Sequence, residues 1–158
     1  CISACPKQAN AIHFGTLSSS AARWADTTTG SAIDTAAHTM SIGTNAVSGY
    51  SITYLGDTLK SGTNDINVAT IAGDADGTPG SEQFAVAFST AGDATIAAGY
   101  EHATPNWKFV ANTTSTVVSE TVPTNTEVIS AYYLANIATN TPSGSYSTSI
   151  TYIATGNF

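Results

Sequence analysis

Two segments near the end of the chain, Glu127-Val-Ile-Ser-Ala-Tyr-Tyr-Leu-Ala-Asn-Ile137 and Tyr146-Ser-Thr-Ser-Ile-Thr-Tyr-Ile-Ala-Thr155, predict the fold. In the second segment, tyrosine and isoleucine on one side alternate with serine and threonine on the other. Such an alternation lets a strand bury one face and expose the other. The first segment is apolar on both faces, which favours a central strand covered on both sides. The stretch from 127 to 155 therefore predicts two long strands.

The residues between these strands, Thr139-Asn-Thr-Pro-Ser-Gly144, have the composition of a turn. Proline fixes its own φ, and glycine tolerates a positive φ. We therefore expect the two strands to form a hairpin. A hairpin of this length cannot bury its apolar face alone, so the rest of the chain must supply an opposite sheet.

Further short strands are expected along the whole chain, and no amphipathic helix of ten residues or more is apparent. They are predicted at residues 11–17, 38–44, 49–56, 66–71, 83–90, 107–111 and 116–119. Short strands at this spacing predict an all-β, two-sheet antiparallel β-sandwich, jelly-roll or immunoglobulin-like, with almost no helix. We expect one domain over residues 11–158, preceded by a lead-in over residues 1–10. Its predicted core residues are Tyr50, Ile52, Phe84, Val86, Phe88, Tyr133, Ile150 and Tyr152.

A short motif occurs twice, about 95 residues apart. Thr44-Asn-Ala-Val-Ser-Gly-Tyr50 resembles Thr139-Asn-Thr-Pro-Ser-Gly-Ser-Tyr146, and each leads into a Ser-Ile-Thr-Tyr strand. The simplest interpretation is two similar hairpins, one in each sheet. Convergence within a chain of restricted composition remains the alternative.

The composition excludes several classes of protein. Only 9% of the 158 residues are charged, whereas 18 serines and 26 threonines are present, and the net charge is −7. The four cations, Lys7, Arg23, Lys60 and Lys108, are scattered, which argues against binding to nucleic acid or to an anionic membrane. No run of about 18 apolar residues predicts a membrane span. We expect an extracellular or cell-surface protein whose signal peptide has been removed.

Cys1 and Cys5 are the only cysteines. A disulfide between them requires a tight turn, which Pro6 disfavours at Cys5. Cross-links to other subunits, a lipid anchor on Cys1, and two free thiols are the other interpretations, and the sequence leaves all four open.

No catalytic machinery is evident, and we expect that the chain is not an enzyme. It contains no Gly-x-Ser-x-Gly motif, and His13, His38 and His102 lie in no diagnostic neighbourhood. No pair of carboxylates is singled out for glycoside hydrolysis.

Three weaker site hypotheses follow from local patterns. Oxygen ligands at Asp74, Asp76 and Glu82 could hold Ca²⁺, although a plain Asp-Gly turn is the favoured interpretation and no other cofactor is expected. Asn112 begins an Asn-Thr-Thr glycosylation triplet. An aromatic platform for sugar rings could be formed by Trp24, Trp107 and Tyr100, for which core packing is the alternative.

Several motifs together resemble those of secreted bacterial surface proteins. They are Phe14-Gly-Thr-Leu17, Thr44-Asn-Ala-Val-Ser-Gly-Tyr50, Leu59-Lys-Ser-Gly62, Pro79-Gly-Ser-Glu-Gln-Phe84, Tyr133-Leu-Ala-Asn-Ile137, Gly144-Ser-Tyr146 and Ile153-Ala-Thr155. The pattern is similar to that of bacterial envelope proteins, including those of small-genome lineages, and more distantly to camelysin-type fibre subunits and chaperone–usher pilins. The resemblance implies a secreted β-sandwich that assembles. The chain has no Leu-Pro-x-Thr-Gly signal, so sortase anchoring is not expected.

We therefore expect a structural subunit of an extracellular filament or surface layer, a homopolymer of this chain. Assembly is expected through donation of the N-terminal segment, residues 1–17, to a neighbouring subunit. The contact residues are then Ala11, Ile12, Phe14 and Leu17. An ordinary first strand folding onto its own domain is the alternative for this segment. The alternative function is a secreted carbohydrate-binding or adhesive module whose partners are surface glycans.

Overall fold

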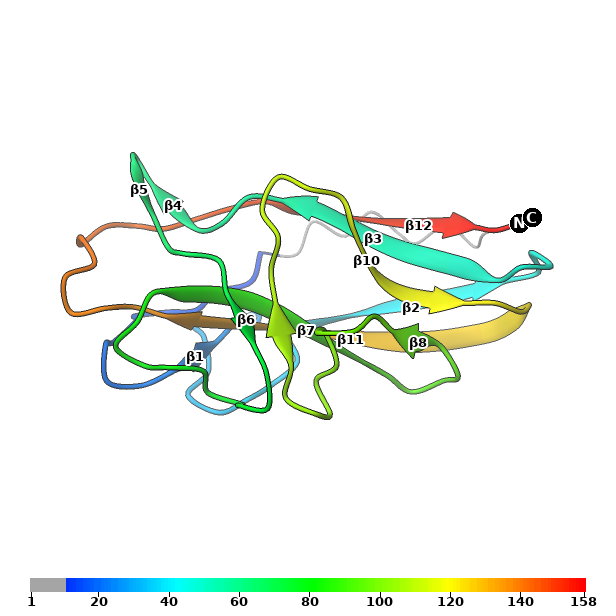
Figure 1. Cartoon of the computed structure of the whole chain (residues 1–158), viewed down its shortest axis with the longest axis horizontal. Coiled ribbons are helices and arrows are strands. Elements are labelled where there is room, and N and C mark those ends of the chain that lie inside the picture. Colours follow the sequence, from blue (N-terminus) through cyan, green and yellow to red (C-terminus); the bar gives the residue numbers. More distant parts are fainter. Residues whose placement is uncertain (1–10) are drawn as a thin grey trace.

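Two antiparallel sheets pack face to face in the computed structural model of this protein, which describes residues 11–158 (Figure 1). Sheet 1 contains β1 (Arg23–Trp24), β2 (His38–Thr44), β6 (Thr70–Ile71), β7 (Gln83–Thr90), β9 (Trp107–Lys108) and β11 (Thr124–Asn136). Sheet 2 contains β3 (Tyr50–Gly56), β8 (Thr95–Ile96), β10 (Ser115–Glu120) and β12 (Ile150–Gly156). A separate ladder joins β4 (Lys60–Ser61) to β5 (Asn64–Asp65). The described residues form no helix, so the predicted all-β sandwich is confirmed.

β11 is the central strand of sheet 1, as its sequence predicts. It pairs with β7 along one edge, and with β2 and then β1 along the other. Its inward residues include Ile129 and Tyr133, which are buried against sheet 2. Leu134 is buried on the opposite face, in a second cluster around Trp24 and Trp107. This second cluster explains why β11 is apolar on both faces in its last third.

The predicted hairpin between the two C-terminal strands is wrong. β12 pairs with β3 in sheet 2, so residues 137–149 cross from one sheet to the other (Figure 1). Both edges of β11 are already paired within sheet 1, which leaves no place for β12 beside it. The alternation predicted for β12 is confirmed from Ile150 onward, because Ile150, Tyr152 and Ala154 pack against the core while Thr151 and Ile153 are exposed. Residues 146–149, which were predicted as part of this strand, lie outside it.

The two copies of the repeated motif are likewise not hairpins. β2 lies in sheet 1 and β3 in sheet 2, so residues 45–49 also connect the two sheets. β2 pairs with β11 and β3 pairs with β12, both antiparallel. Each repeat therefore supplies one strand to each sheet, and the strands of one repeat pair with those of the other.

The accuracy of the remaining strand predictions varies. β2 and β7 have the predicted bounds, β3 begins one residue later than predicted, and β10 is one residue longer at each end. The strands predicted at 66–71 and 107–111 are reduced to the two residues of β6 and the two residues of β9, and β4, β5 and β8 were not predicted. Residues 11–17 form no strand, because Gly15 has a φ of 67° and turns the chain out of an extended path.

The core lies between the sheets and is rich in aromatic rings. The ring centroids of Phe84 and Phe109 are 4.8 Å apart, and Tyr54 stacks on Phe109 at 5.1 Å. Of the eight predicted core residues, six are at most 2% exposed, while Ile150 and Tyr152 are partly buried and pack against the same cluster. The predicted core is therefore confirmed, with the last two residues at its margin.

Candidate functional site: a groove at the open side of the sandwich

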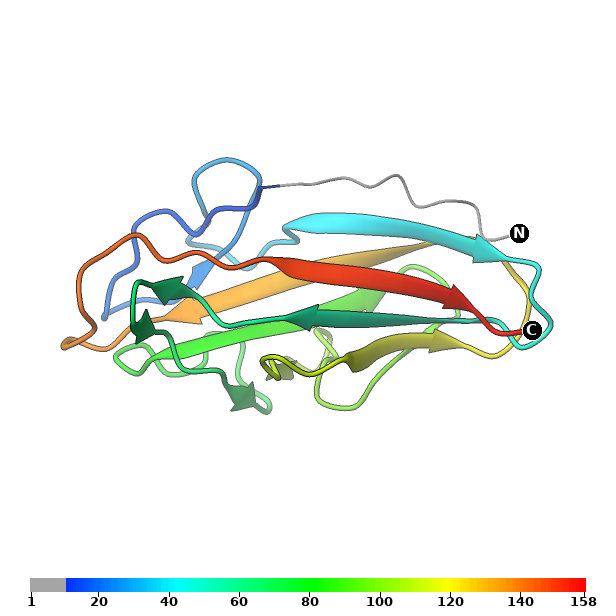
Figure 2. The ribbon, with the colours of Figure 1, turned by 90° about the horizontal axis from the view of Figure 1, so that it is seen from above.

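A groove of about 1440 Å³ lies at one side of the sandwich. One wall is residues 11–17, and the other is residues 141–150, the segment that leads into β12. These segments are blue and orange-red in Figure 2. None of the residues that line the groove is an Asp, Glu, Lys or Arg, and its apolar lining includes Leu59, Phe84 and Ile137. Such a groove suits a neutral occupant with apolar side chains.

The first wall is held by few backbone bonds. His13 and Asp26 exchange two, with N–H···O distances of 2.7 and 3.0 Å, and Arg23 Nε donates to the Phe14 carbonyl at 3.1 Å. The Phe14 ring meets Phe84 edge to face with the centroids 6.2 Å apart. Ile12, Phe14 and Leu17 are partly buried against the core of their own chain, whereas Ala11 is exposed.

The second wall is also mostly irregular backbone. Residues 139–149 form turns and one isolated bridge, in which Ser147 and Lys60 exchange backbone hydrogen bonds of 2.9 and 3.0 Å. Thr141 Oγ1 donates to Glu82 at 2.6 Å, which ties this wall to the start of β7. The two walls therefore face each other without a shared ladder among the described residues.

Three polar side chains meet at the floor of the groove. The Tyr133 hydroxyl lies 2.9 Å from His38 Nε2 and 2.7 Å from the Tyr152 hydroxyl. Burial lowers the pKa of His38 below its usual value of 6.5, so the neutral imidazole is favoured at neutral pH. Burial also raises the pKa of both tyrosines. The floor can exchange hydrogen bonds with an occupant, but it presents neither a carboxylate nor a charged group.

This network was not predicted from the sequence, in which His38 had no diagnostic neighbours. The signal that could have revealed it is the choice of tyrosine over phenylalanine at inward positions of two strands. A buried phenol normally needs a hydrogen-bond partner. His38 and Tyr133 are 95 residues apart in the chain, so only the pairing of β2 with β11 brings them together.

The residues of the calcium hypothesis lie in and beside the loop before β7. Asp76 N–H donates to Asp74 Oδ1 at 3.0 Å, which is an Asx turn, and both side chains are exposed. Glu82 accepts from Thr141 instead of pointing to this turn. Within residues 11–158, no three His, Cys, Asp or Glu side chains are grouped as a metal site.

The aromatic residues of the carbohydrate hypothesis are buried. Trp24, Trp107 and Tyr100 are 5%, 0% and 2% exposed. Trp24 and Trp107 belong to the cluster on the outer face of sheet 1, and Tyr100 contacts Phe88 and Tyr54 in the core. The three rings therefore form no exposed platform for a sugar, and the core alternative is correct for them.

Asn112, the predicted glycosylation acceptor, lies apart from the groove. Asn112 is exposed in a turn before β10 and has a φ of 57°, and its N–H donates to the Gly56 carbonyl at 2.7 Å. Its side chain is thus at the surface, as a glycosylation acceptor requires. Cys1 and Cys5 lie outside the described residues.

A second histidine site lies on the outer face of sheet 1. His102 Nε2 is 2.8 Å from Asp34 Oδ2, and the imidazole stacks on Tyr132 with the centroids 3.6 Å apart. The Tyr132 hydroxyl is 3.4 Å from Ser89 Oγ. These contacts hold the loop around Asp34 and the loop around His102 against β11. We therefore assign these residues a structural role in packing the two loops.

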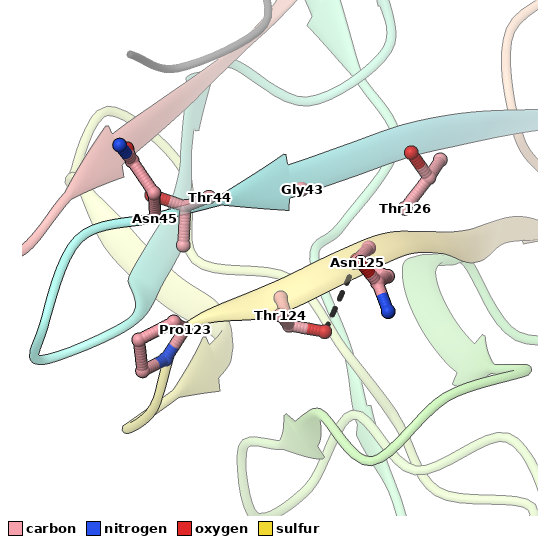
Figure 3. Close-up of a pocket in the computed structure, with 7 residues that line it drawn as sticks. All are labelled: Gly43, Thr44, Asn45, Pro123, Thr124, Asn125 and Thr126. Carbon is pink, nitrogen blue, oxygen red and sulfur yellow. Dashed lines mark hydrogen bonds between the residues drawn. The ribbon is translucent and has the colours of Figure 1, made fainter.

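A shallower hollow of about 470 Å³ lies where β2 ends and β11 begins (Figure 3). Its lining residues are Gly43, Thr44, Asn45, Pro123, Thr124, Asn125 and Thr126, and none of them is titratable. In Figure 3 the side-chain amides of Asn45 and Asn125 point in different directions, and the Thr124 hydroxyl donates to the Asn125 carbonyl at 3.1 Å. Without convergent polar groups, this hollow has no evident chemistry.

Comparison of the chain with protein-family models, with curated proteins and with solved structures finds no match. No helix that is long and apolar enough to cross a membrane occurs between residues 11 and 158.

Proposed function

We propose that this protein is the structural subunit of an extracellular filament or surface layer, and that subunits join by exchanging their N-terminal segments. The observation that carries the proposal is the uncharged groove whose first wall is residues 11–17. This wall contributes Ile12, Phe14 and Leu17 to the core while its backbone is held by the bridge to Asp26 and by one bond from Arg23.

An exchanged segment makes in the neighbouring subunit the contacts that it makes in its own. Exchange of an identical element is therefore a low-cost route to association, because no new complementary surface is needed. A segment donated from one subunit to the next gives a head-to-tail contact, which propagates into a filament unless the rotation closes a ring. Although the chain has a net charge of −7, the neutral lining residues add no like-charge repulsion of their own at this contact.

The direct test locks the segment in its own subunit. His13 and Asp26 face each other as a hydrogen-bonded antiparallel pair. Such a pair has Cα atoms about 5.5 Å apart, which suits a disulfide. The double variant His13→Cys with Asp26→Cys should form no filaments when oxidised and should form filaments again after reduction, as seen by electron microscopy. The unmodified chain under the same two redox conditions is the control for the effects of Cys1 and Cys5.

A deletion of residues 1–17 provides the second test. The shortened chain should fail to form filaments, and added peptide of residues 11–17 should bind and stabilise it. Circular dichroism reports whether the shortened chain is folded. Filaments that persist in the oxidised double variant or in the deletion contradict the proposal, and so does a double variant that does not form filaments after reduction.

A further inference from the structure

β12 is an edge strand without the usual protection. It pairs with β3 through seven consecutive residue pairs, from Ile150 opposite Gly56 to Gly156 opposite Tyr50, with no bulge. No other strand among residues 11–158 pairs with it. Natural edge strands are normally shortened, bulged, or given a charge or a proline, because their free backbone groups recruit other chains. β12 has none of these features over its seven residues.

The sequence of β12 is complementary to itself when two copies run antiparallel. We propose that β12 pairs with β12 of a second copy of this chain, about a two-fold axis that passes beside Ile153. On the outer face this register sets Ile153 opposite the second copy's Ile153 and Thr151 opposite Thr155. On the inner face it sets Tyr152 opposite Ala154 and Ile150 opposite Gly156, so that each large side chain meets a small one.

Neighbouring registers lose this match. An axis beside Tyr152 sets two tyrosine rings against each other on the inner face and sets Thr151 opposite Ile153. An axis beside Ala154 sets Tyr152 opposite Gly156 but again opposes threonine to isoleucine on the outer face. Pairs of like β-branched residues on the exposed face, together with large–small pairs on the inner face, therefore favour the axis beside Ile153.

The same register accounts for an exposed aromatic side chain. Phe158 is 83% exposed, and the bonds of Asn157 to Ser48 and Gly49 keep the chain in line with β12 up to that residue. Continued by two residues, the register brings Phe158 of one copy to the level of Thr148 of the other. Thr148 lies in the groove wall between Tyr146 and Ile150, which are partly buried apolar residues. Pairing therefore covers an aromatic ring and the end of the groove together.

The resulting dimer has one continuous sheet of eight strands, β8-β10-β3-β12 followed by the same four strands of the second copy in reverse order. The partner is a second copy of the same chain, and the interface is isologous. It is distinct from the exchange of N-terminal segments, so either contact can exist without the other.

A charge at the axis tests the contact. In Ile153→Lys, two lysines face each other across the dimer, and their like charges destabilise the pairing. The monomer should tolerate the change, because the Ile153 side chain that the lysine replaces is 49% exposed. The matched control is Leu55→Lys on β3, which adds the same charge on the same outer face at a residue that is 43% exposed but away from the edge. Both variants are made in the deletion of residues 1–17, in which filament growth is expected to stop, after circular dichroism has shown that the shortened chain is folded.

Sedimentation should give twice the 16.1 kDa chain mass, less the deleted residues, for the parent and for Leu55→Lys. Ile153→Lys should sediment as a monomer, with circular dichroism unchanged. If both lysine variants dimerise equally, or if the parent deletion is monomeric at concentrations up to about 1 mM, a range in which weak contacts already associate, the proposal is wrong.

Cross-linking tests the register in the full-length chain. Ile153→Cys should form a disulfide between residues 153 of two copies under mild oxidation, identified by mass spectrometry of the linked peptide. Thr151→Cys, one pleat repeat away on the same face, should give no 151–151 link, because its opposite residue is Thr155. A 151–151 link as abundant as the 153–153 link, or no 153–153 link, overturns the register.

Discussion

Tyrosine hydroxyls in the interior of this protein have specific partners. Tyr50 donates to Glu127 Oε2 at 2.8 Å, and the hydroxyls of Tyr54 and Tyr100 are 3.1 Å apart. Glu127 is only 7% exposed and also accepts a bond from the Asp93 N–H at 2.7 Å. A buried carboxylate is costly unless it is hydrogen-bonded, so these partners explain how the core contains Glu127.

Truncation of a fully buried aromatic residue tests the core. Phe84 is 1% exposed and contacts both Phe14 and Phe109. Phe84→Ala should lower the free energy of unfolding by about 3–5 kcal/mol, because apolar burial is lost and a cavity remains. Urea denaturation followed by tryptophan fluorescence measures the change. A loss below about 1 kcal/mol contradicts a tightly packed position.

The histidine at the floor of the groove predicts a pH dependence of stability. Because the pKa of His38 is lower in the folded chain than its usual value of 6.5, the unfolded chain binds a proton first as the pH falls. The free energy of unfolding should therefore decrease from pH 6.5 down to the lowered folded-state pKa, and His38 should have no effect above that window.

His38→Gln should flatten this part of the stability profile, measured by urea denaturation at a series of pH values. The exposed His13, changed to Gln, is the control for the removal of a histidine elsewhere in the chain. Equal slopes for the wild type and His38→Gln contradict the prediction.

At the scale of elements, the connection from β2 to β3 requires its backbone to approach the backbone at the end of β10 closely. Gly49, at the end of the β2–β3 connection, has a φ of 72°, and a Cβ there would lie 2.1 Å from the Glu120 carbonyl oxygen. The backbone of the connection therefore packs directly on the end of β10. Any side chain at this position pushes the two segments apart.

Gly49→Ala should destabilise the protein by more than about 2 kcal/mol, since it adds a steric clash to the cost of about 1–2 kcal/mol for a left-handed residue with a side chain. Gly62→Ala isolates the second cost, because Gly62 has a φ of 62° and nothing within 4 Å of the added Cβ. Chemical denaturation of both variants measures the difference. Equal losses for the two alanine variants contradict the close approach at Gly49.

The alternation of residues with a period of two correctly predicted which side chains of β7 and β12 face the core, because successive side chains of a strand point to opposite faces. The pairing of the strands was predicted less well. Backbone hydrogen bonds carry no residue identity, and the turn composition at 139–144 suits a hairpin and a crossing between sheets equally. The crossing follows only from the fact that β2, β1 and β7 already occupy both edges of β11.

At the scale of the whole molecule, the net charge of −7 and the neutral surfaces have opposite effects on association. Repulsion between chains acts over the Debye length, which falls from about 30 Å at 0.01 M salt to about 8 Å at 0.15 M. The groove and the β12 edge carry no charged residue, so salt screens the repulsion without weakening these contacts.

Self-association should therefore strengthen as sodium chloride is raised from about 0.01 M to about 0.15 M, measured by light scattering at constant protein concentration and neutral pH. Potassium glutamate at the same ionic strength is the control for effects of a particular ion. Association that weakens with salt contradicts uncharged contact surfaces and indicates ion pairs between subunits.

The sequence by itself determined the long strands β2, β3, β7, β10 and β11, the inward residues of the core and the all-β class, because each depends on alternation and turn chemistry within a few residues. It also determined the near-absence of surface charge. The tertiary structure decided which strands pair, that Trp24 and Trp107 are buried under the loops outside sheet 1, and that His38 meets Tyr133 and Tyr152. These features join residues far apart in the chain, and they depend on which strands pair at each sheet edge.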